Sequence, residues 1–292
     1  MDWTTTLGER GGIASLGQLL GAGATAEELG RRVRDGRLFR PRRGVYALPT
    51  APGSAVAAVR AGGRLSCLPA AGTYGLWAGQ EARLHVTVPA KATRLAALDD
   101  RSVRHWVTRG ESREVWRVSV ADCLRSVVRC APTEDAVAVL DTALSSRLVS
   151  LADLPVLFDT EPNWTRAIVR LARPGAESGV ESLARQRLER RGHHVEQQLH
   201  VRGAGRVDMR IDGRLLVELD GYAFHSDRDA FERDRHRDAE LVRRGHRVLR
   251  FSARQVLQEW RQVESAIEAA LAVPENVRDA PLRMPELRSL AS

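Results

Sequence analysis

The alternation of apolar and polar positions between residues 207 and 219 predicts a β-hairpin in the C-terminal part of the chain. Residues 207–211 read VDMRI, the pattern of a strand with one buried face. Asp212-Gly213 follows, and this pair is a strong signal for a tight hairpin turn. Residues 215–219 read LLVEL, a return strand that is buried on both faces. The hairpin brings Asp208 close to the position opposite Glu218 or its neighbours.

Three carboxylates accompany this hairpin, namely Asp208, Glu218 and Asp220. A charge inside an apolar run is costly unless it is paired or bound to a metal ion. Two acids placed together also repel each other, and a divalent cation held by oxygen ligands removes that repulsion. The acids therefore indicate a metal site, although acids at strand ends are also commonly solvated.

The order of motifs in this region resembles a known nuclease group. Asp208 is followed by ELDG at 218–221, by FH at 224–225 and by FERDRHRDAELVRRGHRVLRF at 231–251. This series resembles the uncharacterised actinobacterial domains related to the Vsr very-short-patch-repair endonuclease, within the PD-(D/E)XK superfamily. The resemblance covers about residues 175–271. It implies a mixed sheet flanked by helices, a Mg²⁺ (or Mn²⁺) site and phosphodiester cleavage in nucleic acid.

The resemblance also implies roles for individual residues. Asp208 and Glu218, with the carbonyl of Leu219, would hold the metal ion; the other residues implied at the catalytic site are Asp220, His225, Glu181, Gln198 and Arg237. His225 would act as general base or acid, and Arg237 would steady the phosphate. Asp220 stands where most of the superfamily has lysine. Either His225 or an arginine of the following helix replaces that lysine, or catalysis is weak or lost.

Glu181 has a second interpretation that the sequence leaves open. Ser178 precedes it by three residues, so the pair is also typical of a capping box at a helix start. The helix that follows is expected to turn Leu183 and Leu188 inward and its arginines, Arg185 included, outward. A strand over 193–201, a helix over 229–244, a buried strand over 246–251 and one closing helix over 255–271 complete the expected domain.

The first fifty residues predict a winged helix-turn-helix. Apolar residues from Ile13 to Leu20 recur at helical spacing, and a second helix runs from a Thr25 N-cap to about Arg34. The run RLFRPRRGVYALP then has the form of a basic wing. The arrangement resembles the N-terminal domain of AbiEi-type antitoxins. The resemblance implies contacts with DNA by seven arginines, Arg31, Arg32 and Arg34 in a groove and Arg37, Arg40, Arg42 and Arg43 on phosphates. A protein–protein module with solvated arginines is the alternative.

Between these parts, residues 51–160 predict a small α+β region. Alternation predicts strands over 85–89, 103–107 and 115–118, and helices over 122–130, 134–145 and 151–158. Trp77, Trp106 and Trp116 are expected in the core, and His85 and His105 are assigned no role. The three cysteines, Cys67, Cys123 and Cys130, lack metal-ligand spacing and are interpreted as buried thiols in a reducing compartment.

Length and charge set the outer bounds. The 292 residues, 43% hydrophobic, suit an α/β protein (α+β overall) with domains over 1–50, 51–160 and 175–272 and a polar tail over 273–292. A net charge of +8 indicates a polyanionic partner. No signal peptide or membrane-spanning run is found, so a cytoplasmic location without membrane contact is expected.

These observations favour a metal-dependent, endonuclease-like protein that binds double-stranded DNA, in defence or repair. The alternative is an antitoxin-like DNA-binding regulator whose nuclease fold is weak or inactive. A third hypothesis is an RNA-directed nuclease or toxin. A toxin–antitoxin partner or a second copy of the chain is a further expected partner.

Overall fold

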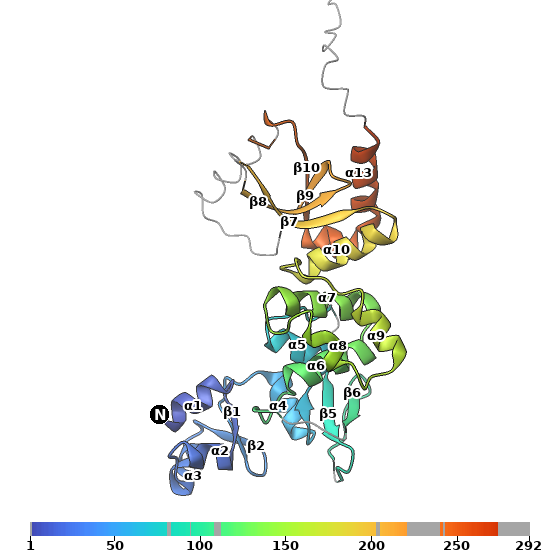
Figure 1. Ribbon diagram of the computed structural model, residues 1–292. Coiled ribbons are helices and arrows are strands. Elements are labelled where there is room, and N and C mark those ends of the chain that lie inside the picture. Colours follow the sequence, from blue (N-terminus) through green and yellow to red (C-terminus); the bar gives the residue numbers. More distant parts are fainter. Residues whose placement is uncertain are drawn as a thin grey trace, which may run out of the picture. The chain divides into compact units, whose positions relative to one another are not determined.

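The computed structural model describes residues 2–273 except 81–82, 94, 108–111, 203–204, 221–239 and 242. The chain divides into two compact units, Met1–Gln186 and Arg187–Ser292. The described residues form twelve helices and three small open sheets, a mixed α/β architecture (Figure 1). Among them, no helix is long and apolar enough to cross a membrane.

The first unit begins with a winged helix-turn-helix. Its elements are α1 (Trp3–Glu9), β1 (Ile13–Ser15), α2 (Leu16–Gly21), α3 (Ala26–Arg34), β2 (Phe39–Arg42) and β3 (Val45–Ala47). Strand β3 lies between β1 and β2, so the wing hairpin is joined to a third strand. The predicted helix 25–34 and its Thr25 cap are confirmed. The expected helix start at Ile13 is wrong, because Ser15 and Gln18 form a capping box that begins α2 at Leu16.

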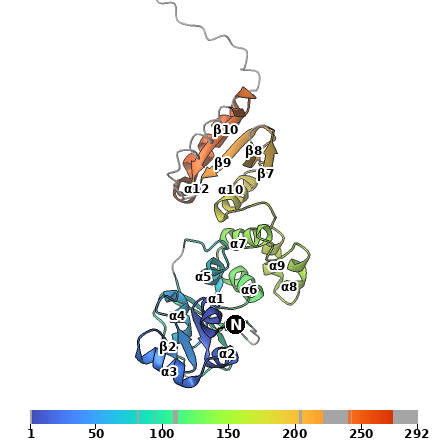
Figure 2. The ribbon, with the colours of Figure 1, turned by 90° about the vertical axis from the view of Figure 1, so that its left-hand side faces the viewer.

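The rest of the first unit is a small sheet with helices packed on it (Figure 1), and Figure 2 shows these helices from another side. Its elements are α4 (Gly53–Arg60), β4 (Arg64–Leu65), α5 (Cys67–Thr73), β5 (His85–Pro89), β6 (Val103–Val107), α6 (Val120–Cys130), α7 (Thr133–Ser145), α8 (Asp153–Leu157) and α9 (Asn163–Val169). Strand β5 is central, antiparallel to β4 and parallel to β6. The predicted strand at 115–118 is wrong, since only Arg117 forms an isolated bridge. Trp116 is buried as expected, but Trp106 is 53% exposed on β6.

A buried ion pair ties α7 to α10 (Gly179–Arg190) within the first unit. The Arg185 guanidinium lies 2.7 Å from an Asp141 carboxylate oxygen, which also accepts a hydrogen bond from Ser182. Both charged side chains are almost fully buried. The prediction that Arg185 points to solvent is therefore wrong. Helical periodicity alone does not reveal a buried arginine whose partner lies 44 residues away.

The second unit contains a four-stranded mixed sheet. Its strands are β7 (Val195–Val201), β8 (Gly205–Ile211), β9 (Leu215–Asp220) and β10 (Arg247–Ser252), in the order β10-β9-β8-β7. The predicted hairpin between β8 and β9 is confirmed. Asp212 and Gly213 both have positive φ, of 50° and 74°, as such a turn requires.

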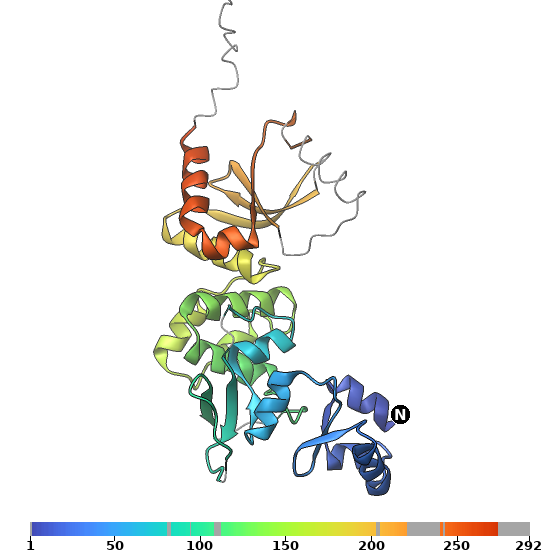
Figure 3. The same ribbon diagram turned by 180° about the vertical axis from the view of Figure 1, so that it is seen from behind.

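Two helices follow β10 and close the unit (Figure 3). The predicted single helix over 255–271 is instead α12 (Ala253–Gln258) and α13 (Trp260–Ala272), divided at Glu259. The Arg187 guanidinium stacks on the Trp260 ring and donates to the carbonyl of Val256. Strand β10 is half-buried over most of its described length and not fully buried as expected.

Candidate functional site

Polar residues at neighbouring register positions on adjacent strands of the second unit's sheet form the candidate nuclease site. On β7, Gln198 has a positive φ of 54° and interrupts the regular pairing with β8. It lies between the Gln197–Met209 and Leu199–Val207 pairs, which places it across from Asp208. Two of the residues expected at the site are therefore opposite each other on neighbouring strands.

The other neighbour of Asp208 is β9. Regular pairing between β8 and β9 extends from Ile211–Leu215 to Met209–Val217. Beyond it, the Asp208 carboxylate accepts a hydrogen bond of 2.8 Å from the backbone N–H of Leu219. The side chain of Asp208 is thus held against the strand that carries Glu218, one residue from that acid.

Glu218 is a buried carboxylate with a basic neighbour. Its side chain is 8% exposed, and its Oε2 lies 3.4 Å from Nη2 of Arg250. The two residues are partners in the parallel register of β9 and β10. Sequence reasoning assigns Arg250 no role, because 32 residues separate it from Glu218 and no local pattern links them. The arginine supplies positive charge that a buried acid needs.

Gln198, Asp208, Glu218 and Arg250 thus form a row across all four strands, which we call the acidic row. Its two carboxylates belong to the hard oxygen ligands that Mg²⁺ takes, usually with one or two carboxylates and several waters. The donor set therefore fits a divalent ion. The Arg250 side chain beside Glu218 adds a donor fork of the kind that binds phosphate.

The remaining residues predicted for this site have different surroundings. Asp220 is exposed at the end of β9. Glu181 lies in the first unit, where it is buried and its carboxylate accepts from the Ser178 hydroxyl and from the backbone N–H of Glu177. The Ser178 oxygen accepts in turn from the Glu181 N–H, so the capping interpretation is confirmed. His225 and Arg237 lie outside the described residues.

The arginines of the wing and of α3 are placed mainly at the surface. Six of the seven are exposed, namely Arg31, Arg34, Arg37, Arg40, Arg42 and Arg43. Arg32 is half-buried, with its guanidinium 5.7 Å from the Trp3 ring. The Arg40 guanidinium lies 5.0 Å from the Tyr46 ring. These two side chains have a packing role beside any contact with a partner.

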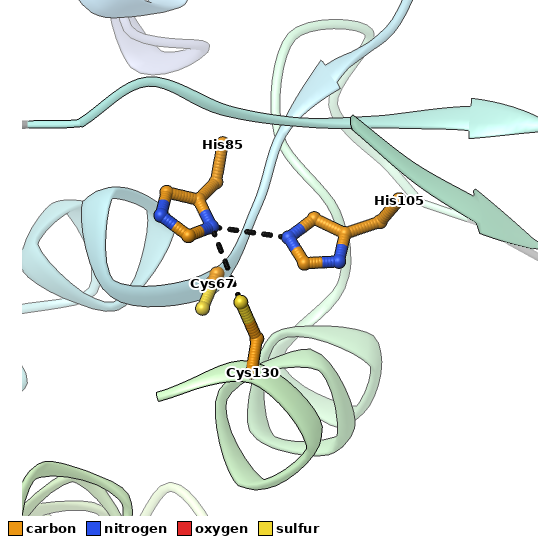
Figure 4. Close-up of side chains that lie close together, drawn as sticks. All are labelled: Cys67, His85, His105 and Cys130. Carbon is orange, nitrogen blue, oxygen red and sulfur yellow. Dashed lines mark hydrogen bonds between the residues drawn. The ribbon is translucent and has the colours of Figure 1, made fainter. Parts of the chain in front are cut away.

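A second polar cluster lies in the first unit, at residues to which sequence reasoning assigns no site (Figure 4). Cys67, His85, His105 and Cys130 converge with their ligand atoms all within 4.8 Å of one another. Hydrogen bonds from Cys67 and from both histidines lower the pKa of the Cys130 thiol far below its ordinary value. The spacing along the chain carries no signal, because 18, 20 and 25 positions separate the four residues.

Comparison with protein families agrees with both resemblances. Residues 181–271 match the family model REase_MTES_1575, and residues 6–49 match the model described as transcriptional regulator, AbiEi antitoxin. No curated protein sequence matches the chain. The acidic row lies within the first of these matches, and the helix-turn-helix and wing lie within the second. The chain therefore carries a restriction-endonuclease-like family domain in its C-terminal part and an AbiEi-antitoxin-like domain at its N-terminal end.

Proposed function

We propose that the chain is a DNA-binding nuclease that hydrolyses phosphodiester bonds at the acidic row with Mg²⁺ or Mn²⁺. The observation that carries the proposal is the Asp208 carboxylate held at β9 beside buried Glu218, within the region that matches the endonuclease-like family. An acid kept in a fixed position on a sheet is pre-organised for metal binding. The entropy cost of ordering this side chain is met during folding, before the ion binds.

The protein's own residues have separate tasks in this proposal. Asp208 and Glu218, with the Leu219 carbonyl, hold the ion. A bound divalent ion lowers the pKa of a water molecule and neutralises charge on the phosphate. The Leu219 N–H orients Asp208 by donating a hydrogen bond to one of its carboxylate oxygens, and the other oxygen is left for the ion. Arg250 lies next to Glu218 and is placed to stabilise the phosphate, the task that lysine would perform at position 220.

The N-terminal domain supplies affinity for DNA. The AbiEi-like match and the surface arginines of α3 and the wing support a DNA-binding role, with α3 in a groove and the wing on phosphates. The net charge of +8 adds attraction that does not depend on base sequence. Delivery of DNA by one domain to a cleaving domain explains why both are present in one chain.

An antitoxin-like regulator without cleavage is the second candidate. The observation that favours it is the Glu218–Arg250 ion pair, because a buried acid that already has a positive neighbour is stable without a metal ion. Asp220 points the same way, since an acid replaces the lysine. In that case the second unit would be a binding or dimerisation platform.

Cleavage assays on the full-length chain distinguish the two. Double-stranded DNA, single-stranded DNA and RNA are incubated with wild type and with Asp208→Asn, with Mg²⁺, with Mn²⁺ and without either. Metal-dependent cleavage that Asp208→Asn loses, while its DNA retardation persists, supports the nuclease. Glu196→Gln is a matched control, since Glu196 is a carboxylate on the same sheet paired with Arg210 outside the row.

Three other outcomes of these assays would contradict the proposal. DNA retardation without cleavage, in wild type and under every metal condition, would replace the nuclease by the regulator. Equal cleavage by wild type and Asp208→Asn would show that the activity arises elsewhere. Cleavage restricted to RNA would support the third hypothesis.

A further inference from the structure

The cluster of Cys67, His85, His105 and Cys130 is assembled from four different elements of the first unit. Cys67 is the first residue of α5, His85 begins β5, His105 is in the middle of β6, and Cys130 ends α6. Strands β5 and β6 are parallel, with His85 opposite Val103 and Thr87 opposite His105. The two histidines are therefore diagonal neighbours on the same face of the sheet.

The distances within the cluster agree with those between the ligands of one tetrahedral metal ion. His85 Nδ1 lies 3.1 Å from His105 Nε2, and Cys130 Sγ lies 3.7 Å from His85 Nδ1. Zinc bond lengths imply roughly 3.3 Å between two nitrogen ligands and roughly 3.6 Å between nitrogen and sulfur. Figure 4 shows the two ring nitrogens and the Cys130 sulfur directed toward a common centre, with Cys67 beside them.

Hydrogen bonding alone explains this convergence poorly. His85 Nδ1 has both His105 Nε2 and Cys130 Sγ as neighbours. A ring nitrogen carries either one proton or one lone pair, so it can form a good hydrogen bond with only one of them. His85 is also buried, where an incompletely satisfied ring nitrogen is expensive. A cation at the centre would satisfy all four groups at once.

We propose that these four residues form a structural zinc site with His85 Nδ1, His105 Nε2 and the two cysteine sulfurs as ligands. Two thiolates and two imidazoles in tetrahedral array are typical of Zn²⁺, whereas Mg²⁺ requires oxygen ligands. All four coordination positions are taken by protein atoms. The site is closed, which is the property that separates structural zinc from catalytic zinc with its open position.

The position of the site suggests what the zinc would stabilise. Strand β6 is at the edge of its sheet and is half-buried or exposed along its length. A metal bond through His105 would hold this strand to β5 and to the ends of α5 and α6. His105 also lines a cavity of about 1240 Å³ whose lining includes Arg42 of the wing and Arg104 of β6. The zinc would therefore keep one wall of that cavity in place beside the wing.

The test is a measurement of bound metal in the full-length chain. Protein purified without chelators, under reducing conditions, is expected to contain one zinc per chain by elemental analysis. Exchange with Co²⁺ is expected to give the visible absorption of a tetrahedral site with thiolate ligands. Loss of a ligand in Cys130→Ser or in His105→Gln should lower zinc affinity by more than about 100-fold, since changes outside the ligand set already cost up to that much.

Cys123→Ser is the matched control that the chain itself offers. Cys123 is a buried cysteine of α6, and its Sγ contacts the carbonyl of Cys67 and is not part of the cluster. This variant should keep its zinc and its Co²⁺ spectrum. Circular dichroism of each variant shows whether lost zinc reflects a lost ligand or a lost fold, and the Co²⁺ spectrum of wild type needs no variant.

Two results would overturn the proposal. One is a folded, reduced wild type that binds neither Zn²⁺ nor Co²⁺ after reconstitution. The other is zinc binding that is as tight in Cys130→Ser as in wild type. The proposal is independent of the nuclease activity, because its ligands are all in the first unit and no step of cleavage enters the measurement.

Discussion

Each of the two units brings together four polar residues from different elements, and the ligand atoms of the two groups differ in kind. The acidic row of the second unit offers oxygen ligands on neighbouring strands, one of them already paired with an arginine. The Cys/His cluster of the first unit offers sulfur and nitrogen ligands from four elements. Carboxylate oxygens suit Mg²⁺, which keeps several waters, and a closed set of sulfur and nitrogen ligands suits a structural zinc. In this protein the kind of ligand atom and the closure of the ligand set distinguish the candidate catalytic site from the candidate structural site.

Removing the metal ion of the acidic row, while the Cys/His cluster keeps its zinc, is expected to have the largest effect. Withholding Mg²⁺ and Mn²⁺ should lower DNA cleavage by about 1,000-fold, because a catalytic divalent ion contributes several kcal/mol to transition-state stabilisation. The zinc content should stay constant, since Mg²⁺ does not compete for thiolates. Cleavage rate and metal content are measured on the same samples. Cleavage that zinc alone supports, and that Cys130→Ser abolishes, would reverse the assignment of the two sites.

Arg250 tests whether the acidic row needs its own positive charge. Arg250→Met should lower cleavage by about tenfold or more and destabilise the protein by about 2 kcal/mol, because Glu218 would stay buried without this ion partner. Arg250→Lys should retain part of the cleavage rate and part of the stability. Cleavage rates and urea unfolding are measured, with hydrogen–deuterium exchange to locate the loss.

Arg210→Met is the control for that change. Arg210 pairs with Glu196 on the same sheet, but both side chains are about a third exposed, so its loss should cost under about 1 kcal/mol. Faster cleavage in Arg250→Met would mean that the arginine competes with the metal ion for Glu218. The acidic row would then disfavour metal binding, as expected for an antitoxin-like regulator without cleavage.

The wing should affect binding and leave chemistry unchanged. Replacing Arg42 and Arg43 together by alanine should weaken DNA binding about tenfold and reduce the slope of log affinity against log salt by roughly two, one for each phosphate contact. Fluorescence anisotropy over a range of salt concentrations measures this. Arg170→Ala removes an exposed arginine of the same unit outside the wing and should change little. An equal loss of DNA affinity in the double variant and in Arg170→Ala would show that total charge, and not a contact by the wing, sets the affinity.

The smallest expected effect is a pH dependence of the second unit. His193 Nδ1 contacts Asp212, in the turn of the β8–β9 hairpin, and its Nε2 contacts Glu268 of α13. Desolvation lowers the pKa of His193, but the hydrogen bonds and charges of the two acids outweigh it and raise the pKa above 6.5. The stabilisation is therefore complete below pH 6.5 and is lost as pH rises through the raised value, by under about 1 kcal/mol.

Urea unfolding at several pH values checks this dependence. His193→Gln should flatten the profile over that range, because glutamine keeps a polar side chain but does not titrate. An unchanged profile in the variant would show that the histidine is not protonated between its two acids.

The elements that depend on neighbouring residues could be predicted from local sequence patterns. The alternation of VDMRI and LLVEL with Asp212-Gly213 between them defined the hairpin, and the Thr25 N-cap defined α3. These patterns are local, because side chains alternate along a strand and a cap acts within one helical turn. For the same reason the hairpin pattern alone is enough to place Asp208 near Glu218.

The contacts between distant segments depend on how the whole fold packs. Arg250 lies beside Glu218 because β10 pairs with β9 in parallel register. Arg185 is buried against Asp141, which lies on a different helix. Cys67 and Cys130 are 63 positions apart and meet His85 and His105 only after a sheet and two helices have packed together. No spacing along the chain encodes such a meeting. The packing of apolar faces decides it, and the polar ligands are carried to their positions by that packing.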